Sequence, residues 1–389
     1  MKNYIYMALC ILFLGTTHGA CGKNDPVIPE PDPVPTPTPT PDPNKDELQY
    51  VYQDNLYGYE CFRIPAIVKT QSGILLAFAE ARKFRSNGDS GDIDLVVRSS
   101  KDNGKTWNDP VMIWDDGENT CGNPVPIVDN TTGRIHLLMT WNDGRDNWSS
   151  LVNGTGHNTR RPYYTYSDDE GKTWVTPREL TQDIKHKDWD WYGTGPVHGI
   201  QIQHGPHKGR LVSPNYFTIR ENGIRKDYSH IVFSDDGGTT WKAGKPAPGD
   251  KVGECTVAEL PDGTLMLNLR PGEGNFRYYT LSTDGGESWG PLSKDAAQLD
   301  PRCQGSLIST PSALFLSNAN STERVNMTIK MSPDNGKSWD KEYVVYEGPS
   351  GYSDMVMLSD NEVAVLYEGG KKRYTEGIAL KIVKLSDFK

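Results

Sequence analysis

An eight-residue pattern that occurs five times constrains the fold of this 389-residue chain more than any other sequence feature. Each copy reads Ser-x-Asp-x-Gly-x-(Thr/Ser)-Trp, and the copies begin at Ser100, Ser167, Ser234, Ser282 and Ser332. Asp and Asn bond their own backbone, and Gly adopts positive φ without steric cost. We predict that each copy, here called an Asp box, is a hairpin turn fixed by its Trp. Recurrence every 48 to 67 residues indicates one repeated supersecondary unit, so the Asp boxes are expected to be scaffold without a catalytic group.

The rest of the chain predicts an all-β fold, because short β-rich runs between turns are common and long helical periodicity is scarce. The roughly 340 residues after the N-terminal region, in units of about 50 to 60, predict a six-bladed β-propeller with four-stranded antiparallel blades. Five Asp boxes leave one blade without a box, which we expect both chain ends to build. The last predicted strand, 378–383, would pair with the first, 49–53, and remove exposed sheet edges. A β-sandwich is the alternative fold.

The first 47 residues are expected to lie outside the folded domain, which we place at 48–389. Residues 1–20 have the positive start and short apolar stretch of an export signal. Cys21 follows the signal as at a bacterial lipoprotein cleavage site, so we expect a lipid on Cys21; the alternative is ordinary cleavage and a soluble product. Residues 21–47 are rich in Pro and Thr, which predicts a semi-rigid linker. The expected product is an exported bacterial protein, either periplasmic, secreted or tethered to the outer membrane or cell surface.

Charge and cysteine content exclude some classes of partner and cofactor. The net charge of −10 argues against non-specific nucleic-acid binding, although a pocket can still concentrate arginines for an anionic ligand. The cysteines of the folded part match no zinc motif and have apolar or strand-like neighbours, which favours free buried thiols over disulfides. These cysteines are Cys61, Cys121, Cys255 and Cys303. We expect no metal, no other cofactor and no obligate protein partner.

The segment Phe62-Arg63-Ile64-Pro65 places an arginine between apolar residues near a strand start. Arginine is rarely buried there unless it is paired, and alone Arg63 would more often belong to a structural ion pair. Together with the five Asp boxes that follow, however, this segment resembles the exo-α-sialidases (neuraminidases). The resemblance covers the chain from about Leu48 to the C-terminus. It implies a six-bladed propeller in which this arginine is one of three that grip the substrate carboxylate.

Three further segments resemble those that carry the catalytic residues of this family. Residues 88–94 match the segment of the acid/base aspartate, which implies that role for Asp89, with Asp92 as the alternative. Residues 253–259 match the segment whose glutamate activates a tyrosine, which implies that role for Glu254 rather than its neighbour Glu259. Gly-Tyr-Ser-Asp at 351–354 matches the nucleophile segment, which implies that Tyr352 attacks the substrate.

The resemblance also implies a set of substrate-binding residues. Arg270 and Arg324 match the second and third carboxylate-binding arginines, and Glu368 matches the glutamate that holds Arg63.

Two weaker matches concern the sugar ring. Arg82 resembles an arginine that touches the ring hydroxyl region, and Asn123 lies in a predicted loop, 122–126, that resembles the one beside the N-acetyl pocket. Tyr216 is a further candidate for lining the pocket.

The chemistry of sialic acid agrees with this set, because arginines offer a carboxylate planar donor forks and stay charged at any working pH. The carboxylate sits on the anomeric carbon and would repel a carboxylate nucleophile by about 4 kcal/mol at 4 Å in an effective dielectric of 20. A neutral phenol avoids this repulsion, and sialidases are a recognised exception among retaining glycosidases in using one. With a pKa of about 10 the phenol needs a base, the role implied for Glu254. Asp89 must be partly protonated to act as an acid, so we expect an apolar setting to raise its pKa.

The main functional hypothesis is an exo-α-sialidase that releases terminal sialic acid from sialylated glycans. A trans-sialidase would use the same residues and differ only in its acceptor site. A non-catalytic sialoglycan-binding propeller would need the arginines but not Asp89, Glu254 and Tyr352 together. An Asp-box propeller with unrelated chemistry would have no reason to carry the three spaced arginines.

Overall fold

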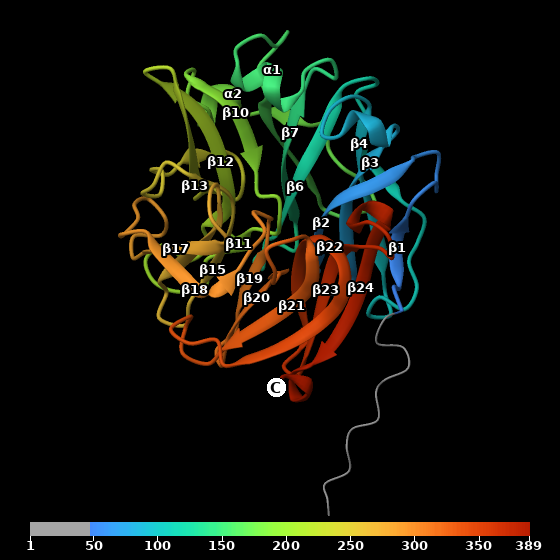
Figure 1. Ribbon diagram of the computed structural model, residues 1–389, viewed down its shortest axis with the longest axis vertical. Helices are drawn as coiled ribbons and strands as arrows, with labels where there is room; N and C mark the ends of the chain where they lie inside the picture. Colours follow the sequence, from blue (N-terminus) through green and yellow to red (C-terminus); the bar gives the residue numbers. More distant parts are fainter. Residues whose placement is uncertain (1–46) are drawn as a thin grey trace, which may run out of the picture. The chain divides into compact units, whose positions relative to one another are not determined.

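The computed structural model describes residues 47–389, which form strands joined by turns and a few short helices (Figure 1). The predicted export signal, Cys21 and all but the last residue of the predicted linker lie outside the described residues. Within 47–389, no helix has the length and hydropathy that a membrane crossing requires. The all-β class is confirmed. The helical segments are α1 (Trp148–Val152), α2 (Thr181–Ile184), η1 (Arg85–Asn87), η2 (Tyr374–Glu376) and η3 (Leu385–Asp387).

Most strands pair antiparallel with a near neighbour in the sequence, and the sheets of eight, five, four and seven strands divide into consecutive groups of four or five. One parallel bridge, from Ile93 to Thr120, joins the first two groups into the eight-stranded sheet. The first two groups are β2 (Cys61–Lys69), β3 (Leu75–Arg82), β4 (Ile93–Ser100) and β5 (Val111–Trp114), then β6 (Thr120–Val128), β7 (Ile135–Asn142), β8 (Arg161–Ser167) and β9 (Arg178–Glu179). The next two are β10 (Trp189–Thr194), β11 (Ile200–Gln201), β12 (Leu211–Glu221), β13 (Ile224–Ser234) and β14 (Lys242–Ala243), then β15 (Val252–Glu259), β16 (Leu265–Pro271), β17 (Phe276–Ser282) and β18 (Ser293–Leu299). The remaining strands are β19 (Ser306–Ser309), β20 (Leu314–Ala319), β21 (Val325–Ser332), β22 (Lys341–Ser359), β23 (Glu362–Gly369), β24 (Gly377–Lys384) and β1 (Tyr50–Gln53).

The long strand β22 belongs to two groups, because its first half pairs with β21 and its second half with β23. β24 then pairs with β1, so that the blue first strand lies beside the red last strand (Figure 1). This pairing joins Tyr50 to Ala379 and confirms the predicted contact between the chain ends. The group that contains it has no Asp box, as expected. The count of six blades itself stays a prediction.

The Asp boxes are turns, as the sequence predicts, and each joins the last two strands of its group. In the first box the Ser100 hydroxyl donates to Asp102 at 2.7 Å and accepts the Gly104 N–H at 2.8 Å. Asp102 also accepts the Thr106 N–H at 2.9 Å. The same three bonds recur in the other four copies. Each turn is therefore closed by its own side chains.

The box tryptophans differ in their polar contacts. The indole N–H donates to the glycine carbonyl of the same box in Trp107 and Trp174, and to Asp295 in Trp339. Those of Trp241 and Trp289 have no hydrogen-bond partner among residues 47–389. Apolar packing is what the rings share, since all five contact hydrophobic clusters between strands.

Buried apolar side chains fill the space between neighbouring groups. One cluster joins Val51 and Tyr52 of β1, Ile67 of β2, and Leu366 and Leu380 of β23 and β24, and so packs the two chain ends together. The four cysteines in the described chain are free and buried, as expected.

Three predicted boundaries were wrong. β12 and β13 pair with each other, and each is 11 residues long. The β-rich runs in the sequence predicted much shorter strands, at 210–213 and 230–233. The outer parts carry alternating polar residues that resemble a loop. β22 (Lys341–Ser359) is one continuous strand, whereas the β-rich runs in the sequence predicted two short strands, at 343–346 and 354–358. Residues 122–126, expected to form a loop from their resemblance to the one beside the N-acetyl pocket, lie within β6 at a register shift between Gly122 and Val125.

Candidate active site

Four strands carry a register shift at the position of a predicted site residue. These shifts lie between Arg63 and Ala66 in β2, Gly122 and Val125 in β6, Val252 and Cys255 in β15, and Ser350 and Ser353 in β22. Ile64 and Asn123 have left-handed backbones there, with φ of 60° and 55°. A bulge redirects a side chain that regular alternation would send into the layer between sheets. The bulges thus turn the side chains of Arg63, Asn123, Glu254 and Tyr352 away from the apolar layers and toward polar neighbours.

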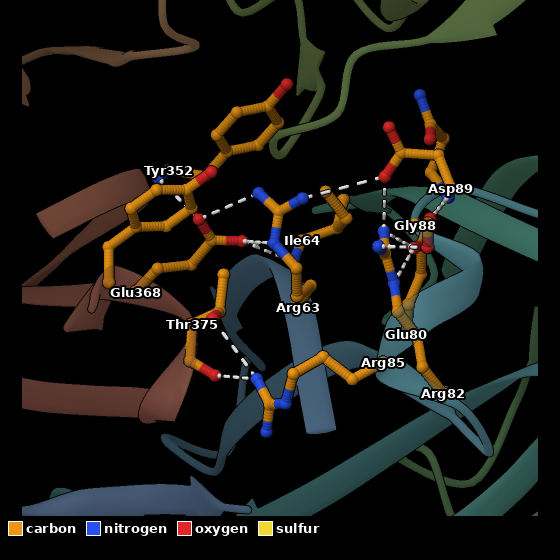
Figure 2. Close-up of polar contacts among 12 residues, drawn as sticks. Arg63, Ile64, Glu80, Arg82, Arg85, Gly88, Asp89, Tyr352, Glu368 and Thr375 are labelled. Atoms are coloured by element: carbon orange, nitrogen blue, oxygen red, sulfur yellow. Dashed lines mark hydrogen bonds and ion pairs between the residues drawn. The ribbon is translucent and has the colours of Figure 1, made fainter. Parts of the chain in front are cut away.

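Arg63 is fixed by Glu368, whose side chain is completely buried. The Arg63 Nε lies 2.9 Å from one carboxylate oxygen, and Nη2 donates to the other at 3.0 Å (Figure 2). Glu368 also accepts the backbone N–H groups of Ile64 and Tyr352, at 3.0 and 3.1 Å. One carboxylate therefore orients an arginine and holds the backbone of the predicted nucleophile.

Tyr352 is the residue on which the three predicted arginines converge. The Cζ atoms of Arg63 and Arg324 lie 5.2 and 5.4 Å from its ring centroid. Arg270 Nη1 donates to the phenol oxygen at 3.1 Å and also to Glu254. These arginines come from strands or strand ends far apart in the sequence, so the fold assembles a cluster suited to one carboxylate.

The Tyr352 hydroxyl donates a hydrogen bond to Glu254. Burial raises the pKa of Tyr352 well above its ordinary value, and the Glu254 charge adds to this rise, while Arg270 and Arg324 oppose it. A raised pKa keeps the phenol protonated, and the Glu254 carboxylate accepts the hydrogen bond from its O–H. This arrangement suits attack by the phenol oxygen with proton transfer to Glu254.

Asp89 lies on the other side of Arg63 and has an exposed side chain. Its Oδ1 is 2.8 Å from Arg82 Nη2 and 3.5 Å from Arg63 Nη1 (Figure 2). Desolvation favours the neutral acid, but the guanidinium groups of Arg82 and Arg63 outweigh it and hold the pKa of Asp89 below its ordinary value. The predicted apolar setting and raised pKa of Asp89 were therefore wrong. Two cations surround the carboxylate there, which the sequence of its loop does not reveal.

A cavity of about 480 Å³ opens beside these groups. The predicted residues that line it are Asp89, Tyr216, Glu254, Arg270, Arg324 and Tyr352. Neither of the alternatives, Asp92 and Glu259, is part of its lining. Glu259 instead accepts the backbone N–H groups of Gln203 and His204, at 2.7 and 2.9 Å.

Arg82 and Asn123 meet at the buried carboxylate of Glu80. Arg82 Nε donates to Glu80 at 3.1 Å, and the Asn123 N–H donates to its other oxygen at 2.9 Å. The Asn123 side chain donates to the Thr194 carbonyl at 3.0 Å and accepts from Arg160 at 3.2 Å. Arg82 and Asn123 are thus linked in one network, in which Asn123 is held on both sides.

Several residues near the cavity were missed in the sequence. Those in its lining are Trp148, Trp191, Arg225, Asp227 and Arg302. Trp148 is 40% exposed, and a tryptophan outside the boxes was the one available signal. Tyr374, whose hydroxyl accepts from Arg324 at 3.0 Å, had no distinguishing sequence context. Within residues 47–389, no group of three or more His, Cys, Asp or Glu side chains could hold a metal ion.

Comparison with known proteins identifies the class of this site. Residues 73–365 match the BNR repeat-like domain family. The sialidase of Bacteroides fragilis is 32% identical over 352 residues, which cover 84% of this chain and 62% of that protein, so the chain spans less than two thirds of that relative. The exo-alpha-sialidase of Aspergillus fumigatus is 31% identical and covers 80% of this chain and 79% of its own length. A solved structure of a Hadza microbial sialidase matches with a TM-score of 0.76 and 30% identity, over 85% of this chain and 67% of that one.

The chain belongs to the sialidase family of glycoside hydrolases. The structural relatives are β-propellers, so the predicted propeller class is confirmed and the β-sandwich alternative was wrong.

Proposed function

We propose that this protein is an exo-α-sialidase that hydrolyses terminal α-linked sialic acids from glycoproteins, glycolipids and oligosaccharides, with retention of configuration. The observation that carries the proposal is the convergence of Arg63, Arg270 and Arg324 on Tyr352, whose hydroxyl donates a hydrogen bond to Glu254. Binding alone would need the arginines. It would not need a phenol–carboxylate pair beneath them and a second carboxylate, Asp89, beside them.

In the proposed reaction, the three arginines hold the substrate carboxylate and thereby set the anomeric carbon over the phenol oxygen. The Tyr352 oxygen attacks that carbon while its proton passes to Glu254. Asp89 gives a proton to the glycosidic oxygen as the bond to the leaving sugar breaks. Water then attacks the tyrosyl–sialoside, giving its proton to Asp89, and Glu254 returns its proton to the phenolate.

Asp89 must gain a proton before it can act, although Arg82 and Arg63 lower its pKa. The substrate carboxylate is expected to raise the pKa of Asp89 in two ways. It competes with Asp89 for Arg63, whose Nη1 lies 3.5 Å from Asp89 Oδ1 in the structure, and it adds a second negative charge near Asp89. Both effects favour the neutral acid. We therefore propose that substrate binding itself raises the pKa of Asp89 and prepares the general acid.

A fluorogenic α-sialoside assay on the wild type and Tyr352→Phe tests the function. The variant is expected to lose about 10²-fold or more of kcat, because the attacking oxygen is absent. A fluorinated sialoside should label the wild type on Tyr352, as mass spectrometry of peptides would reveal. A label on another residue would refute the assignment of the nucleophile.

Two alternatives are outcomes of the same assay. Transfer of sialic acid to added lactose, in preference to water, would identify a trans-sialidase. Binding of a sialoside without turnover by the folded wild type would identify a sialoglycan-binding propeller instead.

We further propose that a lipid on Cys21 and the linker at 21–47 hold the domain at the outer membrane or cell surface. The Cys that follows the predicted signal supports this proposal. A Cys21→Ser variant should move sialidase activity from the membrane fraction to the soluble fraction. Equal membrane association of both proteins would count against the tether.

A further inference from the structure

The three arginines around Tyr352 differ in what holds them. Arg63 pairs with Glu368, and Arg270 pairs with Glu254. Arg324 forms no ion pair among residues 47–389; instead its Nη1 donates to the hydroxyl of Tyr374 at 3.0 Å. An unpaired guanidinium on a flexible side chain has many conformations, so its direction depends on the neutral group that it contacts.

The ring of Tyr374 is shared by two arginines. The Cζ atom of Arg324 lies 4.9 Å from the ring centroid, and that of Arg63 lies 5.5 Å from it. A π-face attracts both cations, which would otherwise repel each other. Tyr374 also contacts the nucleophile segment, because a Cβ added to Gly351 would lie 2.9 Å from its Cδ2 atom.

The segment that carries Tyr374 is rigidly held between β23 and β24. The Glu376 carboxylate accepts the backbone N–H groups of Lys371 and Lys372, at 2.8 and 3.0 Å. Arg85 donates to the carbonyl and the hydroxyl of Thr375, at 2.7 and 3.1 Å (Figure 2). A fixed backbone on each side of Tyr374 gives its hydroxyl a defined position.

We propose that Tyr374 is the positioning residue for Arg324 in sialic acid recognition. Its oxygen accepts one N–H of the guanidinium and leaves the others for the substrate carboxylate. A neutral partner also leaves the full charge of Arg324 available, whereas Glu368 and Glu254 each offset part of the charge of theirs. The hydroxyl of Tyr374 is engaged by Arg324, so we expect it to act through that arginine rather than on the substrate. The inference rests on the proposed function in its choice of ligand.

Calorimetric binding of free sialic acid, which needs no turnover, tests the role. Tyr374→Phe keeps the ring and removes the hydroxyl, so we expect Kd to rise about tenfold, the worth of one hydrogen bond to a charged group. KM for a sialoside should rise by a similar factor, with kcat within about twofold of the wild type. Tyr50→Phe is the matched control, because its hydroxyl donates to the Gly369 carbonyl near the same segment at 3.3 Å and touches no arginine. It should leave Kd unchanged.

A double-mutant cycle decides whether the effect passes through Arg324. Tyr374→Phe should add little to the loss already caused by Arg324→Lys, because the positioned group is then gone. Full additivity, an unchanged Kd in Tyr374→Phe, or an equal loss in Tyr50→Phe would each overturn the inference. A wild type that binds sialic acid without hydrolysis would refute the proposed function alone, since the Kd comparison would still report on Tyr374.

Discussion

The Asp boxes and the active site use the same polar residue types in opposite ways. In a box, Ser, Asp and Thr within eight residues form hydrogen bonds with one another and with the backbone N–H groups of the turn. In the site, Arg63 meets Glu368 across 305 positions and Tyr352 meets Glu254 across 98. The box bonds form with the turn itself, whereas the site bonds require the whole fold. Substitutions in the site should therefore alter chemistry or core electrostatics, and those in a box only local stability.

The largest expected effect is on turnover. Glu254→Gln should lower kcat by about 10²- to 10⁴-fold, because an amide fills the same space but cannot take the phenol proton. The matched control is Glu259→Gln on the same strand, whose carboxylate binds backbone N–H groups of Gln203 and His204 instead. Steady-state kinetics on both variants would measure this. Lost activity in the control with an active Glu254→Gln would reverse the assignment.

The next effect is on stability. Arg63→Leu should lower the free energy of unfolding by about 3–5 kcal/mol, because it leaves the buried Glu368 charge without its cation. Urea denaturation would measure it. Arg134→Leu removes a partly exposed pair with Asp168 and should cost less than about 1 kcal/mol. Equal decreases in the free energy of unfolding of the two variants would contradict this prediction, because the Arg63–Glu368 pair would then contribute no more than an exposed ion pair.

A pH shift should follow when a cation beside Asp89 is removed. Arg82 is a main cause of the lowered pKa of Asp89, so Arg82→Met should raise that pKa. A general acid works in its protonated form, and the limb of kcat/KM that falls with rising pH should move to higher pH. Lys83→Met is the control, because Lys83 acts on the pKa of Asp92. A shifted limb in Lys83→Met alone would make Asp92 the acid.

The smallest effect belongs to an Asp box. Burial opposes ionisation of Asp284, but hydrogen bonds from Ser288 and Ser282 lower its pKa to about 2. A carboxyl with a depressed folded pKa stabilises the fold above its unfolded pKa, and this contribution is lost as the pH falls from about 4 to about 2. Asp284→Ala should cost about 1 kcal/mol at neutral pH, with kcat unchanged. Urea midpoints should converge with those of the wild type in acid; a constant gap would contradict the assignment.

The sequence revealed the boxes directly because their bonds are local, and they carried the propeller prediction. The site residues came from the resemblance to sialidases, since no local rule links Arg63 to Glu368. Register shifts that turn Arg63, Asn123, Glu254 and Tyr352 out of the alternating pattern could not be predicted, because a bulge depends on the partner strand. The prediction of a raised pKa for Asp89 was wrong for a similar reason, because the arginines that lower this pKa, Arg63 and Arg82, come from β2 and β3. Tyr374 was missed because its partner lies 50 positions away.

The pairing of β1 with β24 also matters for how the protein is made. β24 pairs with β23 on one side and with β1 on the other, so a nascent chain cannot close the sheet that carries Tyr352 and Glu368 until residues 377–384 have been made. A chain cut short before Leu380 would leave an open strand edge, the kind of template on which other copies accumulate. The geometry around Tyr352 and Glu368 is thus expected to depend on the presence of β24, so loss of this strand should abolish catalysis.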